Sequence, residues 1–145
     1  MSDVLTLSQI KMPGTARSKD DAIRESGEIL VNAGAVTPAY IDSMFERERS
    51  VSTYMGNYLA IPHGTNESKE SIKRSALSVI RYQEPIDWDG NEVLFALGIA
   101  GYQGGHMDIL SRIAIVFSDT DEVDKLVAAR SAQEIFDLLN AVNEE

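Results

Sequence analysis

Two strand-like stretches in the middle of the chain constrain the fold more than any other feature of the sequence. Ala76–Tyr82 is typical of a β-strand, and the run Val93–Ala100 is apolar enough to be buried on both faces of a sheet. The pair Asp89-Gly90 between them predicts a tight turn. Segments with helical periodicity lie on both sides of this region, so the sequence predicts an α/β protein in which helices cover a sheet.

Five segments show helical periodicity, and several of their ends carry recognisable signals. Ser18 and Ser131 are each followed three residues later by an acidic residue, a pattern typical of a helix N-cap. Thr37-Pro38 predicts another helix start with Thr37 as the cap, and Gly34 predicts the end of the helix before it. The predicted helices cover residues 18–34, 37–49, 106–117, 122–130 and 131–142.

The chain of 145 residues has the usual size of one domain, and we expect a single domain over residues 1–145. It contains no cysteine, which excludes disulfides, thiolate metal sites and cysteine nucleophiles. Thirteen basic and 23 acidic residues give a net charge of −10, so the protein should repel nucleic acid and anionic membranes. The same charge would attract basic protein surfaces, or it serves solubility alone.

No targeting or membrane-spanning segment is apparent in the sequence. The first residues have neither the basic start nor the apolar core of a signal peptide. The longest apolar run, Val93–Ala100, is interrupted by Gly98 and is too short to span a bilayer. We therefore expect a cytoplasmic protein with no direct membrane insertion.

The segment around His63 carries the candidate nucleophile. His63 lies between Pro62, which fixes φ and lacks an N–H, and Gly64, which allows a ligand to approach the backbone closely. A rigid turn after an extended piece is where α/β sheets tend to place sites. Because a neutral imidazole can attack phosphorus and later leave, histidine suits a phosphoryl relay. The local residues leave open whether His63 has this role or only bonds its neighbours in a turn.

His106 and Arg47 are further candidates for a phosphoryl site. His106 follows Gly104-Gly105 and opens a predicted helix, whose N-terminal N–H groups and dipole favour an anion. The alternative is a surface helix start. Arg47 lies in the charged run 46–49, which taken alone is typical of a solvated helix face. The two histidines have no metal-ligand spacing, so we expect no metal site.

Residues 52–65 resemble one known family closely. Their sequence, Ser-Thr-Tyr-Met-Gly-Asn-Tyr-Leu-Ala-Ile-Pro-His-Gly-Thr, is similar to the active-site segment of the mannitol/fructose-type enzyme IIA proteins of the phosphoenolpyruvate-dependent sugar phosphotransferase system. The resemblance continues over residues 28–34, 40–44, 47–48, 97–100 and 105–110. The lead-in Tyr-Met-Gly-Asn looks most like the mannitol branch. Asn57 stands where other members carry an acidic residue, which puts a charge role at that position in doubt.

The resemblance implies a central mixed β-sheet flanked by helices on both faces, and a phosphoryl relay. His63 would accept the phosphoryl group, as a tele-phosphohistidine, from the histidine-containing phosphocarrier protein. It would pass the group to a cysteine of the cognate enzyme IIB, part of a IIB/IIC membrane permease with which the protein would associate transiently. The residue chemistry alone does not report which nitrogen of His63 reacts.

The same resemblance implies supporting roles for other residues. His106 matches the family's second active-site histidine and Arg47 its active-site arginine, and both would stabilise phosphoryl charge. Gly64 and Thr65 would add hydrogen bonds to the phosphate. No metal or organic cofactor is implied, since the transient phosphoryl group on His63 is all that the protein would carry.

Two matters stay open at the level of the sequence. Tyr54, Met55 and Tyr58 form either a docking patch for partner proteins or part of the core. The sugar is mannitol by the lead-in segment, but the same relay would serve fructose or another polyol. A third possibility is a regulatory module that controls a partner through histidine phosphorylation.

Overall fold

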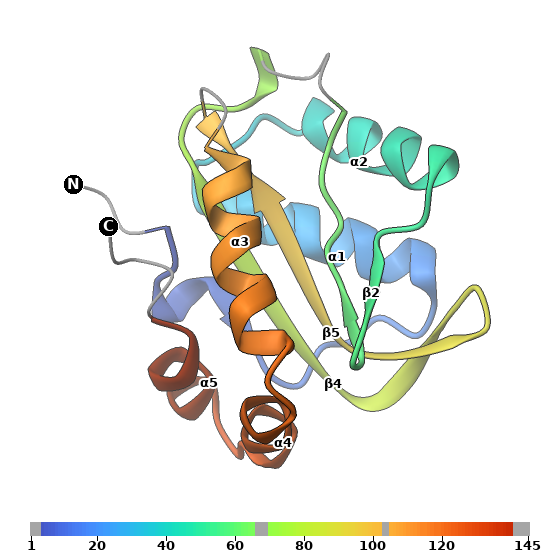
Figure 1. Ribbon diagram of the computed structural model, residues 1–145. Coiled ribbons are helices and arrows are strands. Elements are labelled where there is room, and N and C mark those ends of the chain that lie inside the picture. Colours follow the sequence, from blue (N-terminus) through green and yellow to red (C-terminus); the bar gives the residue numbers. More distant parts are fainter. Residues whose placement is uncertain (1–3, 66–69, 103–104, 141–145) are drawn as a thin grey trace.

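The computed structural model describes residues 4–65, 70–102 and 105–140, with His106 described by its main chain only. These residues form one five-stranded sheet with the order β1-β4-β5-β3-β2 (Figure 1). The β1–β4 and β3–β5 pairs are parallel, whereas β4–β5 and β2–β3 are antiparallel. The sheet is therefore mixed, as predicted. The strands are β1 (Ile10–Lys11), β2 (Tyr54–Gly56), β3 (Leu59–Ala60), β4 (Ala76–Trp88) and β5 (Asn91–Ala100).

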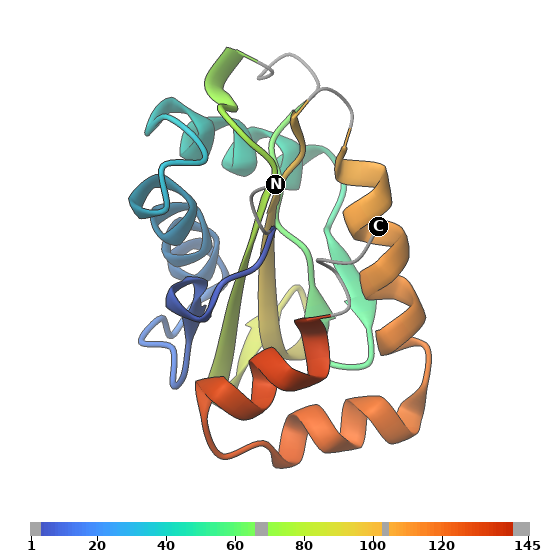
Figure 2. The ribbon, with the colours of Figure 1, turned by 90° about the vertical axis from the view of Figure 1, so that its left-hand side faces the viewer.

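Helices cover both faces of the sheet, which confirms the predicted α/β architecture. One face is covered by α1 and α2, and the other by α3, α4 and α5 (Figure 2). A short 3-10 turn, Leu7–Gln9, precedes β1. The helices are α1 (Lys19–Asn32), α2 (Ala39–Ser50), α3 (His106–Phe117), α4 (Thr120–Ala128) and α5 (Ala132–Leu139).

Most of the residues that were predicted to begin or end a helix are confirmed in that place. The Ser18 hydroxyl accepts from the Asp21 N–H at 3.2 Å, and Ser131 accepts in the same way from Glu134 at 3.2 Å. Gly34 ends α1 with a φ of +75°, a conformation that residues with a Cβ rarely adopt.

Two predicted helix starts were wrong, and one predicted helix end lies outside the residues that the structure describes. Thr37 is not a side-chain cap: α2 begins at Ala39 with Pro38 in the cap position, and Thr37 contributes only its carbonyl, to the Tyr40 N–H. Helix α4 begins two residues before the predicted start because the Asp119 carboxylate caps it. The predicted last helix reached residue 142, and residues 141 and 142 lie outside the described part.

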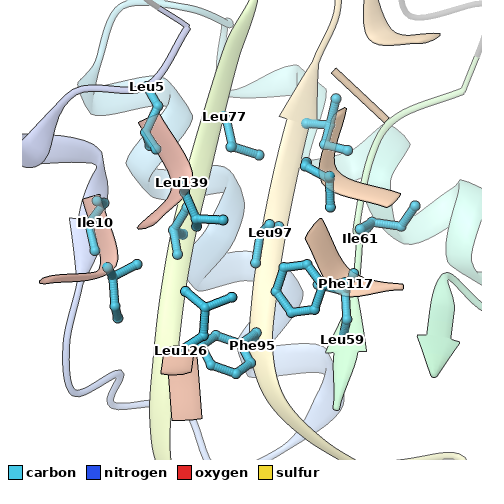
Figure 3. Packing of buried hydrophobic residues seen from close by; sticks show 14 of the residues in the cluster. Leu5, Ile10, Leu59, Ile61, Leu77, Phe95, Leu97, Phe117, Leu126 and Leu139 are labelled. Atoms are coloured by element: carbon cyan, nitrogen blue, oxygen red, sulfur yellow. The ribbon is translucent and has the colours of Figure 1, made fainter. Parts of the chain in front are cut away.

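Strand β5 is buried on both faces, as the apolar run predicts. Phe95 and Leu97 point into the larger apolar cluster under α3, α4 and α5 (Figure 3). Ile99 belongs to the same cluster. Gly98 lies on the opposite face, where an added Cβ would lie 2.5 Å from the Ser78 hydroxyl. The same Cβ would lie 3.1 Å from the Ser26 Cβ on α1, so a side chain at residue 98 would also press against this helix.

Strand β4 is longer than the sequence predicts. The prediction ended it at Tyr82, but the strand runs on to Trp88 through a change of register between Arg81 and Ile86. The extension is stable because Ile86 and Trp88 are buried, Trp88 completely. The predicted turn at Asp89-Gly90 is confirmed, and both of its residues have positive φ. Within the described residues, no helix is both long and apolar enough to span a membrane.

Candidate functional site

His63 follows β3 at the edge of the sheet where β3 and β5 both end. Its main chain forms a parallel bridge with Ile99, and the Ile99 N–H donates to the Pro62 carbonyl at 3.0 Å. On the other side, the Ile61 N–H donates to the Thr53 carbonyl at 3.0 Å. The chain just before His63 is therefore held from two directions, and the His63 side chain itself is half-buried.

A hydrogen bond orients the imidazole ring of His63. Its Nδ1 lies 2.7 Å from the Ile61 carbonyl oxygen. A carbonyl oxygen can only accept, so Nδ1 carries the proton in this contact. In the neutral ring, Nε2 is then the nitrogen with the nucleophilic lone pair.

Tyr40, from the first turn of α2, connects the chain that follows His63 to β5. Its hydroxyl donates to the Ile99 carbonyl at 2.7 Å and accepts from the Gly64 N–H at 2.9 Å. Burial raises the pKa of Tyr40 to about 12, while the bond from Gly64 opposes this rise. The hydroxyl therefore keeps its proton at neutral pH. Tyr40 was not predicted as a site residue, because no local pattern shows that its hydroxyl reaches a strand far along the chain.

Arg47 lies two turns beyond Tyr40 on the same helix. Its Nη1 donates to the Val51 carbonyl at 2.8 Å, in an exposed position. In the described part of the chain, the guanidinium thus bonds the end of α2 and makes no hydrogen bond to His63. The predicted role of Arg47 in charge stabilisation stays a prediction.

Glu48, the residue after Arg47, is buried and was missed as a contributor to the site. Its carboxylate accepts from the Thr53 N–H at 2.7 Å, the Thr53 hydroxyl at 2.5 Å and the Trp88 indole N–H at 3.1 Å. Thr53 in turn accepts from Ile61, so Glu48 fixes the strand that leads to His63. The helical period does predict Glu48 on the same face as the buried Met44, four residues earlier, but it gives Glu48 no role at the site.

His106 is the first residue of α3, with Gly105 in the cap position. Its side chain and Gly104 lie outside the described residues, so the predicted role of His106 stays a prediction. Figures 1 and 2 show α2 and the start of α3 at the same end of the sheet. This is also the end where β3 leads into His63. The fold thus brings the elements that carry Arg47, His63 and His106 to one end of the molecule.

Gly64 and Thr65 follow His63 and are half-buried. The Gly64 N–H is already engaged by Tyr40, so it would have to leave this bond in order to contact a phosphate directly. The predicted phosphate contacts of both residues remain untested. Among the described residues, no three His, Cys, Asp or Glu side chains gather in a way that could hold a metal ion.

The candidate docking residues divide between core and surface. Tyr54 packs against the apolar cluster beneath α1 and α2. Met55 and Tyr58 are 53% and 43% exposed, on the hairpin formed by β2 and β3. This hairpin is tied to α3, since the Asn57 side-chain amide donates to the Phe117 carbonyl at 2.7 Å.

Helix α3 presents apolar side chains of its own to the solvent. Met107 is 59% exposed and Ile115 is 70% exposed, and their spacing of eight residues places both on one side of the helix. We call Met55, Tyr58, Met107 and Ile115 the exposed apolar group. Large apolar side chains that are exposed are candidates for contacts with other proteins.

Comparisons with known proteins agree on one family. The family model described as "Phosphoenolpyruvate-dependent sugar phosphotransferase system, EIIA 2" matches residues 3–142. A curated relative, the mannitol-specific phosphotransferase enzyme IIA component of Halalkalibacterium halodurans, is 51% identical over 141 residues, which are 97% of each chain.

Two solved structures share the fold. One is the complex of enzyme IIAMTL and phosphorylated enzyme IIBMTL from Escherichia coli, with a TM-score of 0.86, 29% identity, and coverage of 93% of this chain and 96% of that one. The other is the nitrogen regulatory protein IIA-Ntr from Neisseria meningitidis, with a TM-score of 0.81, 29% identity, and coverage of 94% and 96%.

Proposed function

Because the chain belongs to the EIIA 2 family of the phosphoenolpyruvate-dependent sugar phosphotransferase system, we propose that it relays a phosphoryl group through His63. The observation that carries this proposal is the contact between His63 Nδ1 and the Ile61 carbonyl at 2.7 Å. It places the proton on Nδ1 and leaves the lone pair on Nε2, so it supports a tele-phosphohistidine.

The relay consists of two balanced transfers. In the first, Nε2 of His63 forms a bond to phosphorus as the donor histidine of the phosphocarrier protein loses its own. In the second, a cysteine thiolate of enzyme IIB forms an S–P bond as the Nε2–P bond of His63 breaks. The ring gains positive character when Nε2 is phosphorylated, and the Ile61 carbonyl stabilises the Nδ1–H through both steps.

Charge stabilisation is the work that remains for the surrounding residues. We assign it to Arg47 and His106, with Thr65 and the backbone after His63 as further donors. Among the described residues, Arg47 bonds one exposed carbonyl, that of Val51, in the unphosphorylated protein. A phosphoryl oxygen carries negative charge and the Val51 carbonyl does not, so the guanidinium would bind the phosphoryl oxygen more strongly and exchange the first partner for the second. The relay requires no metal or organic cofactor.

Mannitol is the sugar that we propose for this relay. The basis is the 51% identity to a relative named as the mannitol-specific enzyme IIA component. We propose enzyme IIB as the acceptor because the matching Escherichia coli structure is a complex with phosphorylated enzyme IIBMTL. The donor would be the histidine-containing phosphocarrier protein, in the cytoplasm. The exposed apolar group suits short-lived contacts with both partners.

The structural likeness to nitrogen regulatory protein IIA-Ntr favours one alternative function. In that case, phosphorylation of His63 would control binding to a regulatory partner, and no cysteine of a permease would receive the group. Transfer to a mannitol-type enzyme IIB separates the two functions, because only a transport subunit must hand the group on rapidly.

The proposal is tested by reconstitution from phosphoenolpyruvate, enzyme I and the phosphocarrier protein. We expect acid-labile phosphate on the wild type and none on His63→Ala, with thermal unfolding unchanged because His63 is only half-buried. Addition of a mannitol-type enzyme IIB should then remove the label from the wild type. Labelling of His63→Ala at the wild-type level would show that another residue carries the phosphoryl group.

A further inference from the structure

A side-chain hydroxyl interrupts the sheet directly beside His63. A parallel bridge between His63 and Ile99 normally has two main-chain bonds, one on each side of the bridged pair. The first is present, from the Ile99 N–H to the Pro62 carbonyl at 3.0 Å. Between the second pair, the Gly64 N–H and the Ile99 carbonyl, the described residues show no direct bond of normal geometry. The Tyr40 hydroxyl bridges this pair: it accepts from the Gly64 N–H at 2.9 Å and donates to the Ile99 carbonyl at 2.7 Å.

We propose that Tyr40 is a positioning residue for phosphoryl transfer, because its inserted hydroxyl holds Gly64 away from β5 and so sets the exit of the chain from His63. This inference rests on the proposed function of His63. It adds a residue on α2 to the relay, one that need not touch the phosphoryl group.

The geometry makes the hydroxyl hard to replace. Tyr40 is buried, and burial keeps its pKa near 12, so a single oxygen serves permanently as donor and acceptor. Without it, the Gly64 N–H and the Ile99 carbonyl either lose a partner or bond each other directly. A direct N–H···O bond needs about 2.9–3.0 Å between nitrogen and oxygen, so the second outcome draws Gly64 toward β5.

Movement of Gly64 changes the path of the chain after His63. It does not change the orientation of the His63 ring, which carries the nucleophilic nitrogen. The bond from Nδ1 to Ile61 lies on the other side of His63 and does not involve Tyr40. Loss of the Tyr40 hydroxyl should therefore misplace the groups that hold the phosphoryl oxygens. Because misplacement by 1 Å can cost up to about 10²-fold in rate, we expect a fall of about tenfold in transfer at saturating phosphocarrier.

Tyr82 provides a matched control. It is also buried, and its hydroxyl donates to the Glu25 carboxylate at 2.8 Å, away from His63. Tyr40→Phe and Tyr82→Phe thus remove the same atom from two buried tyrosines. We expect only Tyr40→Phe to lower the maximal transfer rate, with an unchanged half-saturating concentration of phosphocarrier, because the exposed apolar group is intact.

Nuclear magnetic resonance of the unphosphorylated protein measures chemical shifts near His63, which a general loss of stability would not change. In Tyr40→Phe we expect the Gly64 amide and the His63 ring nitrogens to shift, and in Tyr82→Phe we expect them to match the wild type. In the wild type itself, the Gly64 amide should exchange slowly with solvent, since it donates to a buried hydroxyl. Because this exchange rate is measured on the wild type, it tests the bond between Gly64 and Tyr40 even if Tyr40→Phe does not fold.

Wild-type transfer by Tyr40→Phe, equal losses in both variants, or fast exchange of the Gly64 amide would each overturn the inference. A failure of the proposed function looks different: the phosphate would be absent from His63 in the wild type, whatever residue 40 is. Signals of Gly64 and His63 that do not respond to Tyr40→Phe, in a protein that is phosphorylated on His63, would remove Tyr40 alone from the mechanism.

Discussion

Two buried glutamates hold two regions of the sheet in different ways. Glu25, on α1, accepts from Thr15 and Tyr82 and forms an ion pair with Lys11 at 2.7 Å. Glu48, on α2, has the neutral donors of Thr53 and Trp88 and no ion pair among the described residues. The first carboxylate joins elements that no proposed step uses, whereas the second fixes the strand that leads to the nucleophile.

The difference teaches that burial of a charge does not by itself mark a functional site. Both carboxylates are well satisfied, so both contribute to stability. Only the bonds around Glu48 continue, through Thr53 and Ile61, to the main chain next to His63. Function and stability should therefore separate when the two are compared by mutation.

The largest expected effect comes from removing each carboxylate. Glu48→Ala leaves three buried donors without a partner, so it should lower the free energy of unfolding by about 3 kcal/mol. Glu25→Ala leaves one buried donor, the Tyr82 hydroxyl, and should lower it by about 2 kcal/mol. Denaturant unfolding measures this loss. Phosphoryl transfer at saturating phosphocarrier should fall about tenfold in folded Glu48→Ala and stay at the wild-type rate in folded Glu25→Ala. Equal transfer rates in the two variants would erase the proposed difference between the regions.

Arg47→Gln should affect transfer without affecting stability. Loss of one charge that stabilises a transition state typically costs about 10²-fold, and we expect that order for both the loading of His63 and the onward transfer to enzyme IIB. Arg49→Gln is the matched control, since Arg49 is exposed near the same end of α2. Rapid-quench experiments measure the rates of both steps. Equal rates in Arg47→Gln and Arg49→Gln would show that Arg47 has only a structural role.

The pH dependence of stability should contain a contribution from Glu25. Burial would raise the pKa of Glu25, but hydrogen bonds from Lys11, Thr15 and Tyr82 outweigh it and lower the pKa to about 2. Because the folded pKa lies below the unfolded value of 4.5, this stabilisation is present above pH 4.5 and is lost as the pH falls toward 2.

We expect this titration to account for roughly 2 kcal/mol of the acid sensitivity of the protein. Unfolding of the wild type and of Glu25→Gln, measured between pH 6 and pH 2, checks it. The Gln variant should be less stable near neutral pH and should lose less stability on acidification. Parallel curves for the two proteins would contradict the assignment.

The smallest expected effect concerns partner contacts. Ile115→Ser removes apolar surface from the exposed apolar group and should raise the half-saturating phosphocarrier concentration about threefold, with the maximal rate unchanged. Leu7→Ser is the control, because Leu7 is also exposed but lies in the 3-10 turn before β1. An identical response to both substitutions would place the docking surface elsewhere.

Sequence patterns predicted most of the helices and strands, but not all of their bounds or of the contacts between them. The caps at Ser18 and Ser131 and the double burial of β5 were predictable because each depends on residues a few positions apart. The true length of β4 was not predictable, since its last part is held by Trp88 reaching Glu48, 40 positions away. The cap at Thr37 was wrong because a favoured residue type at a helix start does not guarantee the side-chain bond.

By itself, the sequence determined that a histidine stands between a proline and a glycine after an extended piece, inside a segment typical of one family. Those properties are local, so they can be read without knowing where the chain goes next. Only the tertiary structure decided how that histidine is held. Its neighbour Gly64 meets Tyr40, 24 positions earlier, and Tyr40 meets Ile99, 59 positions later. Such contacts depend on the parallel pairing of β3 with β5 and on the packing of α2 against the sheet, which no local pattern specifies.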